Sequence, residues 1–230
     1  MNSTQRYLLS SIYCNSLCES SRADADDGVP LFSYLSQKLE VDSTLFEDDL
    51  LKLSRSGLIV INRDGKEGKF LDRKEPLCSL TKKGRAEIKV VLVGGVFDLL
   101  HAGHIHTLKS AKSLGDVLII VVATDTTVNS LKKNRKIFHD ENSRLELVSS
   151  IRFVDKAIIG RRTSIYETVD FVKPDIIALG YDQIHDEKLL KKNCLDRGLK
   201  LDVIRLSSPI PQLKSSVIKS ELGNSFYDLQ

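Results

Sequence analysis

Short apolar runs alternate with amphipathic stretches over the second half of the chain. The runs are rich in β-branched residues and predict strands over Lys89–Val93, Val117–Ala123, Ala157–Ile159, Ile176–Leu179 and Leu201–Arg205. Between them, apolar residues at helical spacing predict helices over Ile105–Leu114, Glu141–Ile151, Ser164–Val172 and Glu187–Arg197. Strands that are apolar throughout are typical of a parallel sheet covered on both faces. The pattern therefore predicts an α/β domain over residues 89–230.

Residues 1–88 follow a different pattern. Helical spacing predicts helices over Arg6–Cys18, Leu31–Leu39 and about Thr44–Ser56, with Gly57 as the stop of the third. A period of two then predicts a hairpin, with one strand at Leu58–Ile61 and the return at Phe70–Leu71 and Cys78–Leu80. The segment STLFEDDLLKLSRSGLIVI resembles the winged helix-turn-helix family. We therefore expect a small winged helix-like domain, mainly α with a β-hairpin, to precede the α/β domain.

Composition narrows the function classes. With 34 Lys and Arg against 31 Asp and Glu, the net charge of +3 is far from that of a nucleic-acid coat or a polybasic membrane binder. The longest apolar run, Val117–Ala123, is much shorter than the roughly 20 residues that a membrane span needs. The first residues lack the pattern of a signal peptide, so we expect a cytoplasmic protein. The 4 cysteines are too few for a disulfide framework, and packing of Cys14 and Cys18 on a helix face is favoured over metal binding.

The segment GGVFDLLHAGH follows the first strand of the α/β domain and leads into a helix. Glycines let a backbone approach a ligand, and a helix start offers N–H groups to phosphate. The pair His101 and His104 is therefore a candidate for nucleotide chemistry. Two alternatives stay open: the histidines are structural, or they share a metal ion, for which no third ligand is evident.

At this motif the chain resembles the HxGH nucleotidyltransferase superfamily, in its cytidylyltransferase-like branch. The resemblance extends through ATDTTV, RLELV, GYDQ and KSSVI, in that order, and implies a Rossmann-like fold. It also implies transfer of a nucleotidyl group from a nucleoside triphosphate to a phosphate acceptor, with release of pyrophosphate and with Mg²⁺ or another divalent cation. Two departures matter: the basic loop LKKNRKIF lacks the usual glycine and proline, and the late motif has Ser-Ser instead of Ser-Thr.

The resemblance assigns roles by position. The nucleotide would contact Gly94, Gly95, Val96, Phe97, His101, His104, Asp125, Arg144, Gly180, Asp182, Ser215 and Ser216. With the two histidines, Lys132, Lys133 or Lys136 would serve catalysis at the pyrophosphate, and Asp98 and Tyr181 would face the acceptor.

Simpler interpretations stand beside these roles. The lysine run, which includes Arg135, is also typical of a solvated loop, and Arg144 is placed to pair with Glu141 on a helix surface. Asp98 is a candidate either to orient backbone or to bind magnesium. Asp182 is a candidate cap of the next helix.

Within the superfamily the motifs most resemble archaeal FAD synthases, which adenylylate FMN with ATP. A cytidylyltransferase that acts on a polyol or glycerol phosphate shares most of them and is the alternative. A second alternative is a DNA-binding regulator with a nucleotide-sensing domain, which intact His101 and His104 disfavour. The third helix carries Glu47, Asp48 and Asp49 at the end that should meet DNA, so we expect weak DNA binding at most. A homodimer is a further expectation.

Overall fold

The computed structural model describes residues 1–17, 29–30, 35, 43–62, 77–131, 137–161, 164–207 and 218 of the chain. By its internal contacts the chain divides into two compact units, Met1–Ile88 and Lys89–Gln230.

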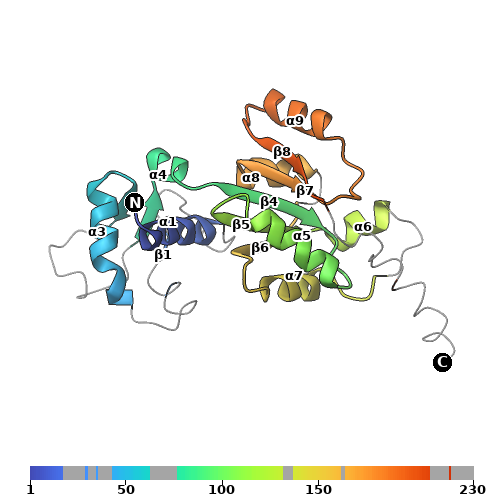
Figure 1. The fold of residues 1–230 in the computed structure, drawn as a ribbon, viewed down its shortest axis with the longest axis horizontal. Coiled ribbons are helices and arrows are strands. Elements are labelled where there is room, and N and C mark those ends of the chain that lie inside the picture. Colours follow the sequence, from blue (N-terminus) through green and yellow to red (C-terminus); the bar gives the residue numbers. More distant parts are fainter. Residues whose placement is uncertain are drawn as a thin grey trace. The chain divides into compact units, whose positions relative to one another are not determined.

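The first unit combines helices with a small antiparallel sheet (Figure 1). Its described elements are α1 (Ser3–Ser16), β1 (Val29–Pro30), η2 (Ser43–Phe46), α3 (Glu47–Arg55), β2 (Ile59–Asn62), β3 (Leu77–Leu80) and α4 (Lys82–Ala86). The strand order is β1-β3-β2. Most of the predicted second helix and the predicted strand Phe70–Leu71 lie outside the described residues. The assignment as a winged helix stays a prediction.

Two helix ends in this unit follow from local chemistry. Asn2 caps α1, because its side chain accepts a hydrogen bond from the Gln5 N–H while the Gln5 side chain accepts one from the Asn2 N–H. The predicted start at Arg6 was therefore late. Gly57 has a φ of 69°, which a residue without Cβ adopts at low cost, and α3 ends beside it as predicted.

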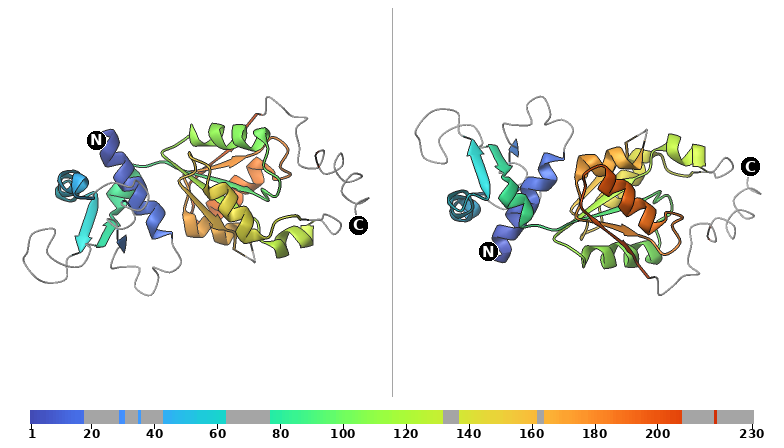
Figure 2. Two further views of the ribbon diagram at one scale, coloured as in Figure 1. Left: turned by 90° about the horizontal axis from the view of Figure 1, so that it is seen from below. Right: turned by 90° about the horizontal axis from the view of Figure 1, so that it is seen from above.

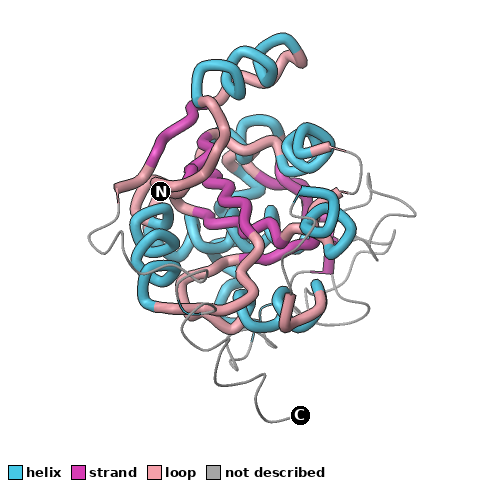
Figure 3. The backbone as a smooth tube through the Cα atoms, turned by 90° about the vertical axis from the view of Figure 1, so that its right-hand side faces the viewer, coloured by secondary structure: helices cyan, strands magenta, loops and turns pink. Residues whose placement is uncertain are grey.

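The second unit is the predicted α/β fold. Its elements run β4 (Val90–Gly95), α5 (Ala102–Lys112), β5 (Val117–Val122), α6 (Asp125–Leu131), α7 (Glu141–Ser149), β6 (Lys156–Ile159), α8 (Ile165–Val172), β7 (Ile176–Leu179), α9 (Glu187–Asp196) and β8 (Asp202–Arg205). All pairings in its 5-stranded sheet are parallel, in the order β6-β5-β4-β7-β8. Figure 3 shows the strands enclosed between helices, and the colours of Figure 2 place α5 and α7 on one face of the sheet and α8 and α9 on the other.

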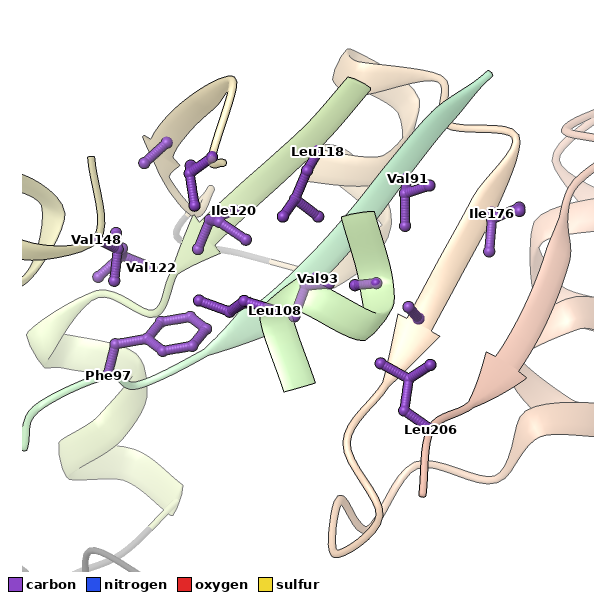
Figure 4. Close-up of a cluster of buried hydrophobic side chains, with 14 residues drawn as sticks. Val91, Val93, Phe97, Leu108, Leu118, Ile120, Val122, Val148, Ile176 and Leu206 are labelled. Atoms are coloured by element: carbon purple, nitrogen blue, oxygen red, sulfur yellow. The ribbon is translucent and has the colours of Figure 1, made fainter. Parts of the chain in front are cut away.

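The central strands are buried on both faces, as their apolar sequences predicted. Val91 and Val93 of β4 belong to a cluster that also contains Leu118 and Ile120 of β5 and Leu108 of α5 (Figure 4). Each Å² of apolar surface that these side chains bury stabilises the fold by about 25 cal/mol. The packed sheet is therefore a stable base for the loops at its edge.

The strand order sets where those loops converge. β4 lies between β5 and β7 in the sheet. The connection that follows β4 leads to β5 on one side of it, and the connection that follows β7 leads to β8 on the other side. Ligands in open parallel sheets bind beyond the carboxyl ends of the strands at such a switch point. Helix α6 was not predicted, because it is short and rich in β-branched residues; Thr124, which accepts a hydrogen bond from the Thr127 N–H, marks its start. Within the described ranges, no helix combines the length and hydropathy needed to span a bilayer.

Candidate nucleotide-binding site at the switch point

His101 and His104 lie side by side at the start of α5. His101 is the N-cap residue, and its Nδ1 accepts a hydrogen bond from the Gly103 N–H at 3.2 Å. The two ring centroids are 4.0 Å apart, with the planes tilted by 43°. A nitrogen that accepts carries no proton, so the neutral His101 ring bears its hydrogen on Nε2. The N-cap role of His101 thus orients an N–H donor at the positive end of a helix.

Both rings favour the neutral form. The pKa of His104 is lowered to about 4, first by burial and then by its neighbour His101, while the Asp182 carboxylate acts in the opposite direction. Burial also lowers the pKa of His101, again opposed by Asp182. The Nδ1 atom of His104 is buried and has no hydrogen-bond partner among the described residues. The pair therefore offers neutral N–H donors at the start of α5.

The turn between β4 and α5 depends on its second glycine. A Cβ on Gly95 would lie 2.7 Å from the Phe97 ring, so only glycine fits there. Phe97 has a φ of 56°, which is strained for a residue with a Cβ, and its ring is buried beneath the loop, 5.7 Å from the ring of His104. A Cβ at Gly94, in contrast, would meet no heavy atom of the described chain within 4 Å. The turn thus places the Phe97 ring beside His104 and leaves open space next to the backbone of Gly94.

Gln183 joins the two strands that border the switch point. Its Nε2 donates to the Gly94 carbonyl at 2.7 Å, and its Oε1 accepts from the Gly180 N–H at 3.2 Å. The loop that it fixes carries Asp182, which is exposed and acts electrostatically on both histidines. Asp182 does not cap the next helix, because the N-cap of α9 is Asp186.

Tyr181 lies beside Asp182 and is half-buried. The pKa of Tyr181 is raised, first by burial and then by Asp182. Its ring therefore keeps the phenolic proton and presents a hydrogen-bond donor in the same loop.

Arg205, at the end of β8, holds this loop from the other side. Its guanidinium donates to the carbonyls of Gly180, Gln183 and His185 at 2.7–3.0 Å and to Oε1 of Glu187 at 2.7 Å. Neither Arg205 nor Gln183 was predicted to have a role. The signal in the sequence is slight: an arginine at the end of a predicted strand, and a glutamine directly after Asp182.

Arg144 was expected to contact the nucleotide, a role that stays a prediction, and the structure shows its protein partners. It is fully buried, and its guanidinium donates to the carbonyls of His139, Val96 and Ala123 and to Oδ1 of Asp125. Because its donors are directed at these protein groups, it holds the loops after β4 and β5 together. The alternative of a surface pair with Glu141 is wrong, because the Arg144 side chain is buried.

Asp125 is correspondingly engaged by the protein. Its N–H donates to Glu141 Oε2 at 2.8 Å, and its carboxylate pairs with Arg144 at 2.5 Å. Asp125, at the start of α6, is thus held by Arg144 and Glu141 while its side chain stays 39% exposed, and its contact with the nucleotide stays a prediction.

Asp98 is 5% exposed, and its carboxylate accepts hydrogen bonds from the backbone N–H groups of Phe138 and His139. Of the two roles left open for it, the structure favours orientation of backbone. Direct contact with the acceptor is not favoured, because the carboxylate faces this segment.

Several expected contacts fall outside the described residues. These are Lys132, Lys133, Lys136, Ser215 and Ser216, and Arg135 of the same basic run also lies outside the described residues. Among the side chains that are described, no group of three or more His, Cys, Asp or Glu residues is placed to hold a metal ion.

Comparison with known proteins bears on this site. Residues 92–221 match the family described as cytidylyltransferase-like. A relative named FAD synthase from Picrophilus torridus is 46% identical over 55% of this chain and 89% of its own length. Another, from Thermoplasma volcanium, is 49% identical over 55% of this chain and 87% of its own length. A solved structure from Thermoplasma volcanium, described as a lipopolysaccharide core biosynthesis protein, is 45% identical, with a TM-score of 0.51 over 53% of this chain and 98% of that one.

Proposed function

Because the chain belongs to the cytidylyltransferase-like family, we propose that it transfers the adenylyl group of ATP to FMN, giving FAD and pyrophosphate. The observation that carries the proposal is the similarity to relatives named FAD synthase, which reaches 46–49% identity over most of their length. The α/β unit, which holds the histidine pair, is the part of the chain that the family match covers.

In the proposed reaction, an oxygen of the FMN phosphate attacks the α-phosphorus of ATP. A new P–O–P bond forms, the bond to the oxygen that bridges to the β-phosphorus breaks, and pyrophosphate leaves with that electron pair. Negative charge grows on the phosphoryl and leaving oxygens, so positioning and preorganised donors dominate catalysis. Nε2–H of His101 and the ring of His104 supply such donors at the start of α5, and the backbone of Gly94–Phe97, at and after the end of β4, is proposed to add others.

Other residues position the loops that carry the groups proposed to contact the substrates. Arg144 holds the loops after β4 and β5, and Gln183 and Arg205 hold the loop that carries Asp182. Lys132, Lys133, Lys136, Ser215 and Ser216 are proposed to bind the phosphates by resemblance to the superfamily alone.

Magnesium is proposed as a companion of ATP. The described carboxylates do not form a ligand set: Asp98 accepts from backbone and Asp125 pairs with Arg144. Mg²⁺ takes many of its ligands from substrate phosphates and water, so it would enter with the triphosphate. No step in this account depends on it.

A panel of donors and acceptors tests the function. Purified protein is incubated with Mg²⁺, with ATP or CTP, and with FMN, glycerol 3-phosphate or a polyol phosphate, while pyrophosphate is measured. We expect release with ATP and FMN. Release with CTP and glycerol 3-phosphate alone would establish the alternative cytidylyltransferase, and no release with any pair would favour a nucleotide-sensing regulator. The homodimer and the cytoplasmic location are likewise proposals, for sedimentation and cell fractionation to test.

A further inference from the structure

Phe138 and His139, just before α7, are tied to the loop that follows β4. Oδ1 of Asp98 accepts hydrogen bonds from the N–H of Phe138 at 3.0 Å and from the N–H of His139 at 2.9 Å. On the other side, Nε of Arg144 donates to the His139 carbonyl at 3.0 Å. Two buried charged side chains thus fix the backbone of one short segment.

The side chains of this fixed segment face outward. Phe138 is 53% exposed and the His139 side chain is 41% exposed, whereas Asp98 is 5% exposed and Arg144 is fully buried. Burying charged groups is costly, and a phenyl ring that is half exposed adds less to the stability of the core than a buried one does. An aromatic side chain on a fixed surface backbone is typical of a binding surface, because less conformational entropy is lost when a ligand stacks on it.

His139 is oriented by the same loop. Its Nδ1 lies 2.8 Å from the backbone carbonyl of Asp98. A carbonyl only accepts, so Nδ1 carries the proton and Nε2 of the neutral ring is an acceptor. The segment therefore presents an apolar face, from Phe138, beside an oriented acceptor.

The position of the segment fits the acceptor better than the nucleotide. Asp98 is three residues before His101, so the anchor of the segment lies within about 10 Å of the histidine pair along the chain. In FMN, a five-carbon ribityl chain separates the phosphate from the isoalloxazine ring, so the ring must be bound away from the reacting phosphorus. Phe138 and His139 are anchored to the loops after β4 and β5, whereas Gly94 and Gln183 meet on the β7 side.

We propose that Phe138 and His139 bind the isoalloxazine ring of the acceptor, Phe138 by stacking on its face and Nε2 of His139 by accepting a hydrogen bond from the ring imide N–H. The proposal rests on FMN as the acceptor. It makes Asp98 and Arg144 positioning residues for acceptor binding, which they serve through the backbone of Phe138 and His139.

Substitutions at the two rings test this. Phe138→Ala removes the stacking surface and leaves the backbone hydrogen bonds, so the Kd for FMN, measured by quenching of flavin fluorescence, should rise about 5- to 100-fold. The KM for ATP should stay within about twofold, and Phe138→Tyr should restore binding. His139→Asn can keep the bond to the Asp98 carbonyl while losing the acceptor, and should weaken FMN binding about 3- to 10-fold. Leu189→Ala, at a similarly exposed apolar residue on α9, is the control and should change neither value.

The outcomes separate the two proposals. A wild-type chain that forms FAD, together with Phe138→Ala and His139→Asn variants that bind FMN normally, would overturn the assignment of this surface. A rise in the KM for ATP in place of the Kd for FMN would assign the surface to the nucleotide and would also overturn it. A wild-type chain that neither binds FMN nor forms FAD would contradict the proposed function itself, and with it the ligand named here. Melting temperatures near that of the wild type verify that each variant is folded.

Discussion

The rings of His101 and His104 lie with their centroids 4.0 Å apart; burial lowers the pKa of both, and His101 lowers that of His104 further. Two imidazolium ions at this distance would repel each other, and His104 is too buried to be well solvated as a cation. Asp182 moderates the effect, because its carboxylate favours the charged form of both rings. The pair is therefore placed to bind an anionic ligand, and the negative charge of that ligand would stabilise protons on the two rings.

The folded protein should lose stability as the pH falls through the titration of His104. Its pKa is about 4 in the fold and 6.5 in the unfolded chain, so the unfolded state binds more protons between these values. Above pH 6.5 both states are neutral and this histidine contributes no pH dependence; from pH 6.5 down to about 4 the free energy of unfolding falls. Urea unfolding of the wild type and of His104→Gln across this range measures it. The variant should show a shallower fall, His106→Gln should resemble the wild type, and equal slopes in all three would contradict the buried neutral His104.

Arg205 should be needed for turnover although its role is to hold a loop and not to contact the substrates. Arg205→Lys removes the fork that bonds several carbonyls at once, so the loop with Asp182 and Gln183 should loosen and kcat should fall about 10- to 100-fold. The pKa of His104, followed by NMR, should drop further because Asp182 no longer raises it. Arg197→Lys, at an exposed arginine paired with Asp170, is the matched control. An unchanged kcat and an unchanged His104 titration in Arg205→Lys would show that the loop holds itself.

The α/β unit should act without the first unit. All residues proposed for the chemistry lie beyond Lys89, and each unit has its own buried core. A shortened chain that begins at Arg85 should keep most of the rate of FAD formation, because the α/β unit has its own core. A shortened chain that is folded by circular dichroism yet inactive would show that the first unit completes the site.

The first unit should bind duplex DNA weakly at most. Glu47, Asp48 and Asp49 form the first turn of α3, where they complement the helix dipole but would repel phosphate. Asp49 also accepts a hydrogen bond from Nε2 of Gln5 at 2.9 Å, which ties this end of α3 to α1. A band-shift titration at physiological salt should show no sequence-specific complex in the nanomolar range. A complex that survives these conditions would revive the interpretation as a regulator.

The strands and the histidine pair were predictable because their signals are local. β7 was predicted with the bounds it has, since a run of apolar β-branched residues between polar turns has few alternatives. The burial of Arg144 was not predictable in the same way. An arginine on a helix is usually exposed, and Arg144 is buried because the loops after β4 and β5 come together around it in the folded chain. Arg205 and Gln183 were missed for the same reason, because most of their partners are backbone groups, which leave no trace in the sequence.

The most direct test of the central claim follows the α-phosphate of ATP. With ATP labelled at the α-phosphate and FMN as acceptor, the label should appear in FAD, with one pyrophosphate released for each FAD formed. His101→Ala and His104→Ala should each lower this rate by at least about 10²-fold while the chain stays folded, because each removes a donor to the developing charge. His106→Ala, on the same helix, should leave the rate unchanged. Label that stays with free adenylate or enters no flavin, or near-wild-type transfer in either variant, would contradict the account.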